Sequence, residues 1–236
     1  MRDTSNPRST SRIAGLLFFV THVTSVAAVV FYGGGAFDAT LPLAGRSSVL
    51  TGALLEIVLA AAVVGTSVAL YPLVRRAGEA LAAGYIGLRT LEASVILAGV
   101  VALLPVVAVP GSQAGAGLSP EVIAGLRLVH DWTFVVGPGL ICPINTLVIA
   151  WLLFNSGQVP RWIPTLGLGG ATLIGLVNVG VLFGLTATQP IAAVPIFAWE
   201  IALASYLVFR GIKPATQEAP AEARLPEAFR TVGAVG

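Results

Sequence analysis

The sequence predicts an all-α membrane protein, a polytopic bundle of six transmembrane helices with both termini in the cytoplasm. Of its 236 residues, 56% are hydrophobic and only 10% are charged, whereas soluble domains carry about 25% charged residues. A chain of this length cannot enclose so much apolar surface in a soluble core. A bilayer removes that difficulty, because the outer face of each helix can stay apolar. The net charge of +2 is uninformative alone, but the positions of the basic residues orient the chain.

Six segments are long enough to cross a bilayer, which takes about 20 apolar residues at about 1.5 Å per residue. They cover residues 13–32, 50–73, 84–109, 132–154, 166–185 and 191–209. The first is longer than the apolar core of a signal peptide, about 7–15 residues, so we expect it to remain as a helix. The predicted domain covers residues 12–213. Tails at 1–11 and 214–236 flank it, and the second should be mobile because it has few large apolar residues.

Lys and Arg concentrate on the cytoplasmic side of membrane proteins. With the amino terminus inside, ten basic residues fall on that side, against two outside, Arg46 and Arg127. The ten are Arg2, Arg8, Arg12, Arg75, Arg76, Arg161, Arg210, Lys213, Arg224 and Arg230. An even number of spans then leaves both termini in the cytoplasm.

The fourth segment differs from a plain membrane anchor. Ser119-Pro120-Glu121 before it is typical of a helix start, so either a short interfacial helix lies there or the span begins early. Gly137-Pro138-Gly139 and Pro143 interrupt its outer half. Pro frees a backbone carbonyl that a neighbouring helix or water must satisfy in lipid. We therefore expect this face to point into the bundle beside Asp131 and Glu56, unless the break is only a packing kink.

Ionisable side chains within the spans are the candidate ligand-binding residues, because each costs about 2.5–3.5 kcal/mol to insert at mid-bilayer. Arg89 and Glu92 are three residues apart and can pair on one helix face. Glu56 and Glu200 have no cation nearby in sequence. Each must stay protonated, because burial disfavours the charged form, or meet Arg89 or a His across the bundle. We predict one shared central cluster of these four residues, with His22 as an optional fifth member. The full candidate set is His22, Glu56, Arg89, Glu92, His130, Asp131, Asn145 and Glu200.

Cofactor and metal chemistry are not predicted. His22 lies mid-span and His130 at the outer edge, and this difference in depth argues against a bis-histidine haem. His130, Asp131 and Glu121 are too few and too loosely spaced for a metal site. The sequence has no hydrolase, metalloprotease or phosphate-loop motif, so no catalytic residue is assigned. The expected partner is the lipid bilayer; a small solute or proton, a homo-oligomer and a membrane partner stay open, and nucleic acid is not expected.

Several blocks of sequence resemble a known family. In order, they include ALLEIVLAAAVV, LRTLEASVI, LRLVHDWTFVVGPGL, LLFNSGQVPRWIPTLGLGG and PIFAWEIALASYLVFRGIKP. The chain resembles, over about residues 12–214, the bacterial integral-membrane family known as domain of unknown function 4386. The resemblance implies a bundle of six or seven helices in a bacterial plasma (inner) membrane. It carries over no activity and no site residue.

Three functions remain open. The favoured hypothesis is binding or transport of a small solute, proton or cation that enters at His130 and Asp131 and meets Glu56 beside the broken fourth span. The second is a non-catalytic structural or regulatory membrane subunit, in which the polar residues only fix helix register. The third is a lipid-acting enzyme with His130 and Asp131 as an acid–base pair. It ranks last because no nucleophile or metal set lies nearby in sequence, so a non-enzymatic role is favoured.

Overall fold

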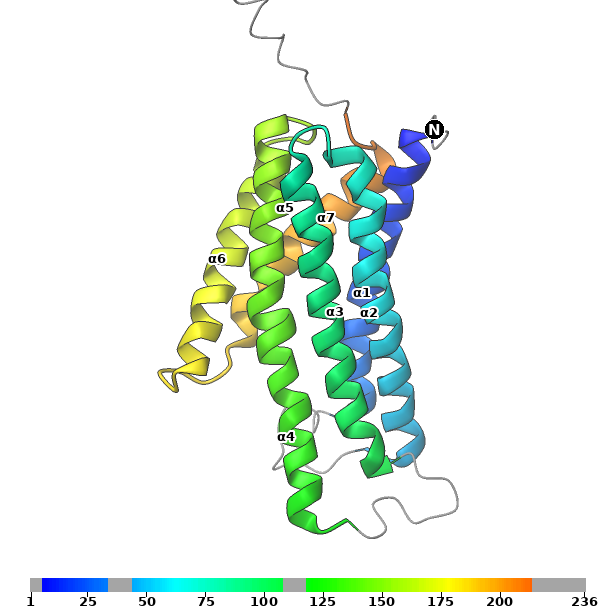
Figure 1. Cartoon of the computed structure of the whole chain (residues 1–236), viewed down its shortest axis with the longest axis vertical. Helices are drawn as coiled ribbons and strands as arrows, with labels where there is room; N and C mark the ends of the chain where they lie inside the picture. Colours follow the sequence, from blue (N-terminus) through cyan, green and yellow to red (C-terminus); the bar gives the residue numbers. More distant parts are fainter. Residues whose placement is uncertain (1–5, 34–43, 108–117, 214–236) are drawn as a thin grey trace, which may run out of the picture.

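The computed structural model describes residues 6–33, 44–107 and 118–213, and within these ranges it is all-α. Six helices are long and apolar enough to cross a membrane (Figure 1). The first, α1 (Pro7–Tyr32), begins where the Asn6 side chain caps the backbone N–H of Arg8 and ends at Gly33, whose φ of 73° is left-handed. It is followed by α2 (Arg46–Val74) and α3 (Glu79–Val107).

The fourth crossing is one continuous helical stretch of 37 residues. It consists of α4 (Pro120–Val136), a π-helical turn η1 (Gly137–Ile141) and α5 (Cys142–Ser156). Ser119 caps its first turn, as predicted, by accepting from the Val122 N–H. The early start of the span is therefore confirmed, and there is no separate interfacial helix over residues 118–136. The break at Gly137–Ile141 widens the helix by one residue per turn without ending it, a common form of π-bulge.

The last two crossings are shorter. They are α6 (Trp162–Leu182) and α7 (Val194–Phe209), and α7 is preceded by the 3-10 turn η2 (Pro190–Ala193). Figure 1 shows that the α6–α7 turn lies well above the lower tip of α4, and that α6 leans away from the other helices toward that turn.

The helices close into a ring. Each of α1, α2 and α3 packs on the next, α3 packs on α4 and α5, α5 packs on α6, α6 on α7, and α7 returns to α1. Glycines permit two of these contacts, since a Cβ on Gly15 would lie 2.7 Å from the Ala204 oxygen and one on Gly170 would lie 2.7 Å from the Ile196 nitrogen. Small residues allow such close approach between membrane helices. Gly169 of α6 differs, because a Cβ built on it would meet no atom within 4 Å. Not every glycine of α6 therefore lies at a contact with another helix.

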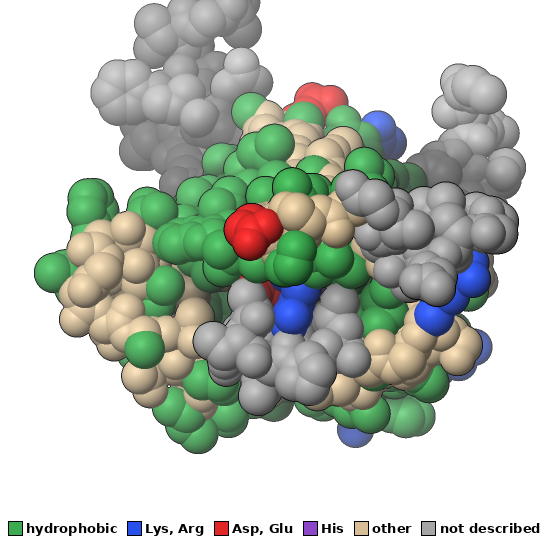
Figure 2. All heavy atoms as spheres, turned by 90° about the horizontal axis from the view of Figure 1, so that it is seen from below, with side chains coloured by type: hydrophobic (Ala, Val, Ile, Leu, Met, Phe, Trp, Pro, Cys, Tyr) green, Lys and Arg blue, Asp and Glu red, His purple; other side chains and the backbone are tan. Residues whose placement is uncertain are grey.

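Both the buried core and the outer surface of the bundle are largely apolar, whereas the surface of a soluble protein is more polar than its core. Large side chains at the centre include Phe18, Tyr85 and Trp199, and many apolar side chains face outward. Seen from the end opposite the termini, the described surface is mostly hydrophobic with few charged groups (Figure 2). Along the sides of the helices, large apolar side chains such as Ile57, Val101 and Leu176 are exposed, and such an exterior fits lipid as its solvent.

The helices extend beyond the segments that hydropathy marked. Five of the six begin earlier than predicted: α1 at Pro7, inside the predicted tail of residues 1–11, α2 at Arg46, α3 at Glu79, the fourth crossing at Pro120 and α6 at Trp162. Hydropathy marks the apolar part of a helix, whereas capping and proline at the first position decide where the helix begins. Residues 108–109 of the third predicted segment and the tail at 214–236 lie outside the described residues.

Candidate functional site

The predicted candidate residues form two clusters, so the prediction of one shared cluster is wrong. We define the inner polar cluster as His22, Thr66, Arg89, Glu92, Asn145 and Glu200, and the outer polar cluster as Tyr32, Glu56, His130 and Asp131. Both α1 and α2 contribute one residue to each cluster, ten positions apart. At about 1.5 Å per residue, this spacing separates the clusters by roughly 15 Å along the bundle, too far for Glu56 to reach Arg89.

Arg89 is the centre of the inner polar cluster. Its side chain is almost completely buried, and Nη1 lies 3.1 Å from Glu92 Oε2. Nη2 donates to Thr66 Oγ1 at 3.1 Å, and the guanidinium lies 5.6 Å from the ring centre of Phe18. Asn145 donates from Nδ2 to the same Glu92 oxygen at 2.7 Å. The predicted Arg89–Glu92 pair is therefore confirmed, and Glu92 is held by charge-assisted hydrogen bonds.

Glu200 belongs to the same cluster but is held less tightly. Its Oε1 lies 3.9 Å from Arg89 Nη2, and its Oε2 lies 3.5 Å from His22 Nε2; both distances exceed those of ordinary hydrogen bonds. His22 Nδ1 donates to the Phe18 carbonyl at 2.8 Å. Because a carbonyl only accepts, Nδ1 carries a hydrogen, and Nε2 is the ring nitrogen that can gain or lose one. Glu200 thus meets both partners predicted for it, Arg89 and a His.

Three members of the outer polar cluster, Tyr32, Glu56 and His130, are closed off from the surface. Tyr32 donates its hydroxyl hydrogen to Glu56 Oε2 at 2.9 Å. His130 Nε2 lies 3.2 and 3.3 Å from the two Glu56 oxygens, and its Nδ1 lies 3.5 Å from Asp131 Oδ1. Tyr32, Glu56 and His130 have no exposed surface. His130 was predicted at the outer lip of the membrane, but it is enclosed between α1, α2 and α3 because its imidazole is the partner of Glu56.

Two glycines make this enclosure possible. A Cβ on Gly52, one turn from Glu56 on α2, would lie 2.8 Å from the Tyr32 ring. A Cβ on Gly99 of α3 would collide with Thr133 and lie 3.4 Å from the His130 ring. With only hydrogen at these positions, α1 and α4 come close enough for Tyr32 and His130 to reach one carboxylate.

A cavity of about 680 Å³ connects the level of Asp131 with the inner polar cluster. It lies between α1, α3, α4, α6 and α7, and His22, Arg89, Glu92 and Glu200 line it. Asp131 lines it near the α6–α7 turn, together with Trp132 and Gln189. Glu56, His130 and Asn145 do not line it. The cavity therefore separates the candidate residues into those a solute can reach and those it cannot.

Comparison with known proteins identifies the family. A family model described as a domain of unknown function matches residues 13–211. The chain belongs to the DUF4386 family. The resemblance found in the sequence is thus confirmed over most of the chain. No curated protein and no solved structure matches it. Membership of DUF4386, together with six membrane-length helices, makes the chain a multi-pass membrane protein of unestablished activity.

In this DUF4386 protein the π-helical turn faces the cavity. Pro138 and Gly139 line it, and a Cβ on Gly139 would lie 2.9 Å from Oδ1 of Asn178 on α6. The prediction that the broken face points into the bundle is confirmed. On α3, the residue next to the π-helical turn is Glu92. The backbone oxygen of Glu92 lies 3.5 Å from a Cβ built on Gly137. The break therefore adjoins the inner polar cluster, not Glu56 as predicted.

Three polar residues of the DUF4386 chain escaped the sequence analysis. Tyr32 and Thr66 complete the two clusters, and Gln158 donates from its buried amide to the Leu73 carbonyl at 2.9 Å and the Lys213 carbonyl at 3.3 Å. Gln158 lies in the SGQVPRW block after α5, and its contacts join that segment to the end of α2 and to the segment that follows α7. Hydroxyl and amide side chains are common in membrane helices, and nothing in the sequence marks these three. Among the described residues, no group of three or more His, Cys, Asp or Glu could hold a metal ion.

Proposed function

We propose that this protein binds a small solute within the membrane, in the cavity that ends at the inner polar cluster, and that binding serves transport of the solute or of a proton. The observation that carries the proposal is the contact of the cavity with Arg89, Glu92, Glu200 and His22. Ionisable side chains in membrane helices are costly and generally mark solute or ion pathways. A concave, mostly apolar pocket with a few convergent polar groups is the usual form of a small-molecule site.

The size of the cavity supports a small organic solute. Its volume of about 680 Å³ lies within the range of about 300–1,000 Å³ typical of ligand pockets. The π-helical turn on its wall is a second supporting feature, since such turns occur frequently at functional sites. A solute entering near Asp131 would reach Glu200 without disturbing the buried Tyr32, Glu56 and His130.

The outer polar cluster favours the second candidate function, a structural or regulatory subunit. Its three buried groups, Tyr32, Glu56 and His130, satisfy one another without a ligand, as expected of residues that fix helix register. The ionisable residues that line the cavity are not explained in that way. The third candidate, a lipid-acting enzyme using His130 and Asp131, loses support because His130 has no exposed surface.

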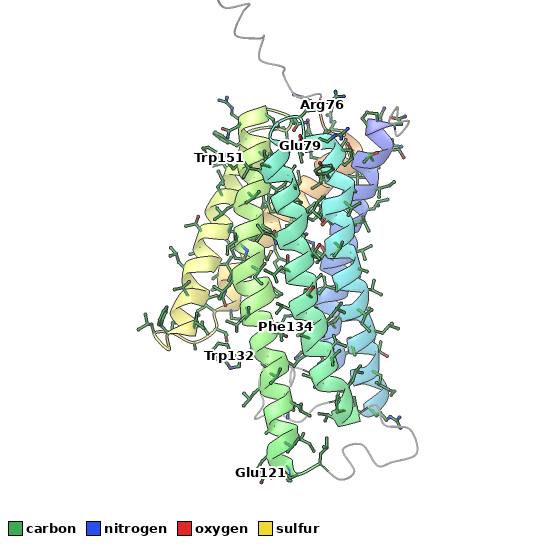
Figure 3. The ribbon with its side chains drawn as sticks, viewed as in Figure 1. Arg76, Glu79, Glu121, Trp132, Phe134 and Trp151 are labelled. Atoms are coloured by element: carbon green, nitrogen blue, oxygen red, sulfur yellow. The ribbon has the colours of Figure 1, made fainter. Side chains whose placement is uncertain are left out.

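We further propose that the protein lies in the plasma membrane with both termini in the cytoplasm. Basic residues gather at the end of the bundle that holds the termini, including Arg8, Arg75, Arg161 and Arg210, while Arg46 lies at the other end. Trp132 and Trp151 are 44% and 52% exposed and lie at different levels of the long helix (Figure 3). Their separation, roughly 28 Å at 1.5 Å per residue, matches the hydrocarbon thickness of about 30 Å.

Tryptophans favour both interfaces, so the first turns of α4 would project beyond the lipid. A fluorescent protein that folds only in the cytoplasm, fused at residue 236, should fluoresce. The same fusion after Pro120 should be dark. The reverse pattern would overturn this orientation.

Labelling of Cys142 tests the proposed binding. This residue is the single cysteine of the chain and lines the cavity. In nanodiscs, a small methanethiosulfonate reagent should label it, and Ser25→Trp, which places a large side chain in the same cavity, should slow labelling at least about tenfold. Thr51→Trp on the exposed face of α2 is the matched control and should leave the rate unchanged. Equal rates in all three proteins would contradict an accessible cavity.

Reconstitution tests the transport part. In liposomes that contain a pH-sensitive dye and carry an imposed pH gradient, the wild-type protein should dissipate the gradient faster than empty liposomes. Glu200→Gln should reduce the rate to the empty-liposome value, because the acid that reaches both the cavity and His22 is lost. Glu121→Gln, at the lower tip of α4 (Figure 3), should behave like wild type. Unchanged flux in Glu200→Gln would remove transport from the proposal.

A further inference from the structure

Resting on the proposed function, we infer that the solute of this cavity is an organic cation with a small apolar body, and that the cation and a proton compete for Glu200. The inference uses the charges that line the cavity, the contacts of each acid and the apolar and aromatic walls.

The charged lining has an excess of acids. Among the described residues that line the cavity, three are acidic, Glu92, Asp131 and Glu200, and Arg89 is the one Lys or Arg. A group taken from water into this low-dielectric space is stabilised where its charge is compensated. A cation meets an excess of carboxylates there, whereas an anion meets repulsion from the same groups.

The contacts identify the acid that remains available. Glu92 receives hydrogen bonds from Arg89 at 3.1 Å and Asn145 at 2.7 Å, so its charge is compensated within the protein. Glu200 has only the longer contacts, 3.5 Å to His22 and 3.9 Å to Arg89. Its side chain is 13% exposed, against 4% for Glu92. Glu200 is therefore the carboxylate that a cation in the cavity can approach.

His22 supplies the competing proton. His22 Nδ1 already carries a hydrogen, which it donates to the Phe18 carbonyl. One further proton can sit on either His22 Nε2 or Glu200 Oε2 of this close pair. With that proton, Arg89, Glu92, Glu200 and His22 sum to zero charge; without it, they sum to −1. A cation restores neutrality when it takes the place of the proton, so binding should release one proton to solution.

The groups around Glu200 come from several helices. Those that titrate or carry charge are His22 from α1, Arg89, Glu92 and Tyr85 from α3, and Cys142 from α5. α6 contributes no titratable residue, since Trp162–Leu182 contains none, and Asp131 of α4 lines the distant end of the cavity. Arg89 stays compensated by Glu92, so His22 is the group next to Glu200 that can share the exchanged proton with it.

The walls favour an apolar body on the cation. The described lining is mostly apolar and includes three aromatic rings, Trp132, Phe134 and Phe197. Trp132 and Phe134 lie on the lower half of the long helix (Figure 3), and Phe197 stands edge-on to His22 at 4.8 Å between ring centres. Aromatic faces attract quaternary and protonated amines. A hydrated metal ion would leave most of this apolar surface unused.

The experiment compares two molecules of the same shape. Phenyltrimethylammonium and tert-butylbenzene differ essentially in the charge on one central atom, and the ammonium cannot titrate. Binding is measured in nanodiscs through protection of Cys142, with free concentrations corrected by empty nanodiscs. The cation should bind the wild-type protein at least about tenfold more tightly at pH 8 than at pH 6, with about one proton released per cation. Binding of tert-butylbenzene should not change with pH.

Variants assign the effect to Glu200. Glu200→Gln should remove the pH dependence and the preference for the cation while tert-butylbenzene still binds, and Glu200→Asp should retain part of the preference. Proton release by the wild-type protein tests the inference even if a variant fails to fold. If tert-butylbenzene binds and the cation does not, or if the cation binds without proton release, the inference is wrong and the proposed function stands. If neither molecule binds, both are wrong.

Discussion

The outer and inner polar clusters contain the same kinds of residue, an acid facing a histidine, yet their surroundings differ. In the outer cluster, the Glu56 oxygens have Tyr32 and His130 within 3.3 Å and no exposed surface. In the inner cluster, Glu200 has its nearest partner at 3.5 Å and faces a cavity. Residue type does not distinguish the two. The number and distance of partners do, so stability should depend on one acid and binding on the other.

The largest expected effect is the loss of stability in Glu56→Ala. Removing one member of a buried pair leaves its partner without compensation, which typically costs about 3–5 kcal/mol. Unfolding in mixed micelles by added denaturant should show this loss. The double variant Glu56→Leu, His130→Leu should recover much of it, because an apolar pair of similar volume needs no compensation. A single variant as stable as wild type would show that the outer polar cluster does not hold the bundle together.

Tyr32→Phe should have the next largest effect. It removes one hydrogen bond to a carboxylate without creating a cavity, and hydrogen bonds to charged groups contribute about 1.5–3 kcal/mol. The same denaturant titration measures it. In the Glu56→Ala background the substitution should cost almost nothing, because the acceptor is already absent. Equal costs in both backgrounds would contradict the Tyr32–Glu56 bond.

The sequence predicts the crossings better than the contacts between them. Hydropathy and length identify all six, because a bilayer sets the length of each apolar run. The Arg89–Glu92 pair is also predictable, since both residues lie on one helix three positions apart. The Glu56–His130 pair joins residues 74 positions apart, and it depends on how α2, α3 and α4 slide against one another. Packing at Gly52 and Gly99 sets that register. The hydrophobic periodicity within a single helix does not predict how that helix is aligned with its neighbours.

Gly52→Ala tests that register directly and should cost about 1–3 kcal/mol, the usual penalty of overpacking. Its methyl would displace the Tyr32 ring and with it the hydroxyl bound to Glu56. Gly87→Ala is the matched control, because the space around Gly87 is open and alanine favours the helix by about 0.5–1 kcal/mol. If the two variants unfold at the same denaturant concentration, close packing at Gly52 does not matter for the outer polar cluster.

Glu200→Gln should have the smallest effect on stability, within about 1 kcal/mol of wild type. Its contacts with His22 and Arg89 are longer than hydrogen bonds, and Arg89 keeps Glu92 as its partner, so a neutral amide leaves no new uncompensated charge. Denaturant titration of Glu200→Gln beside Glu56→Gln makes the comparison at equal side-chain size. The outer variant should lose several times more free energy of unfolding than the inner one. Equal losses would mean that Glu200 is held as firmly as Glu56, and the distinction between a structural acid and an accessible one would then fail.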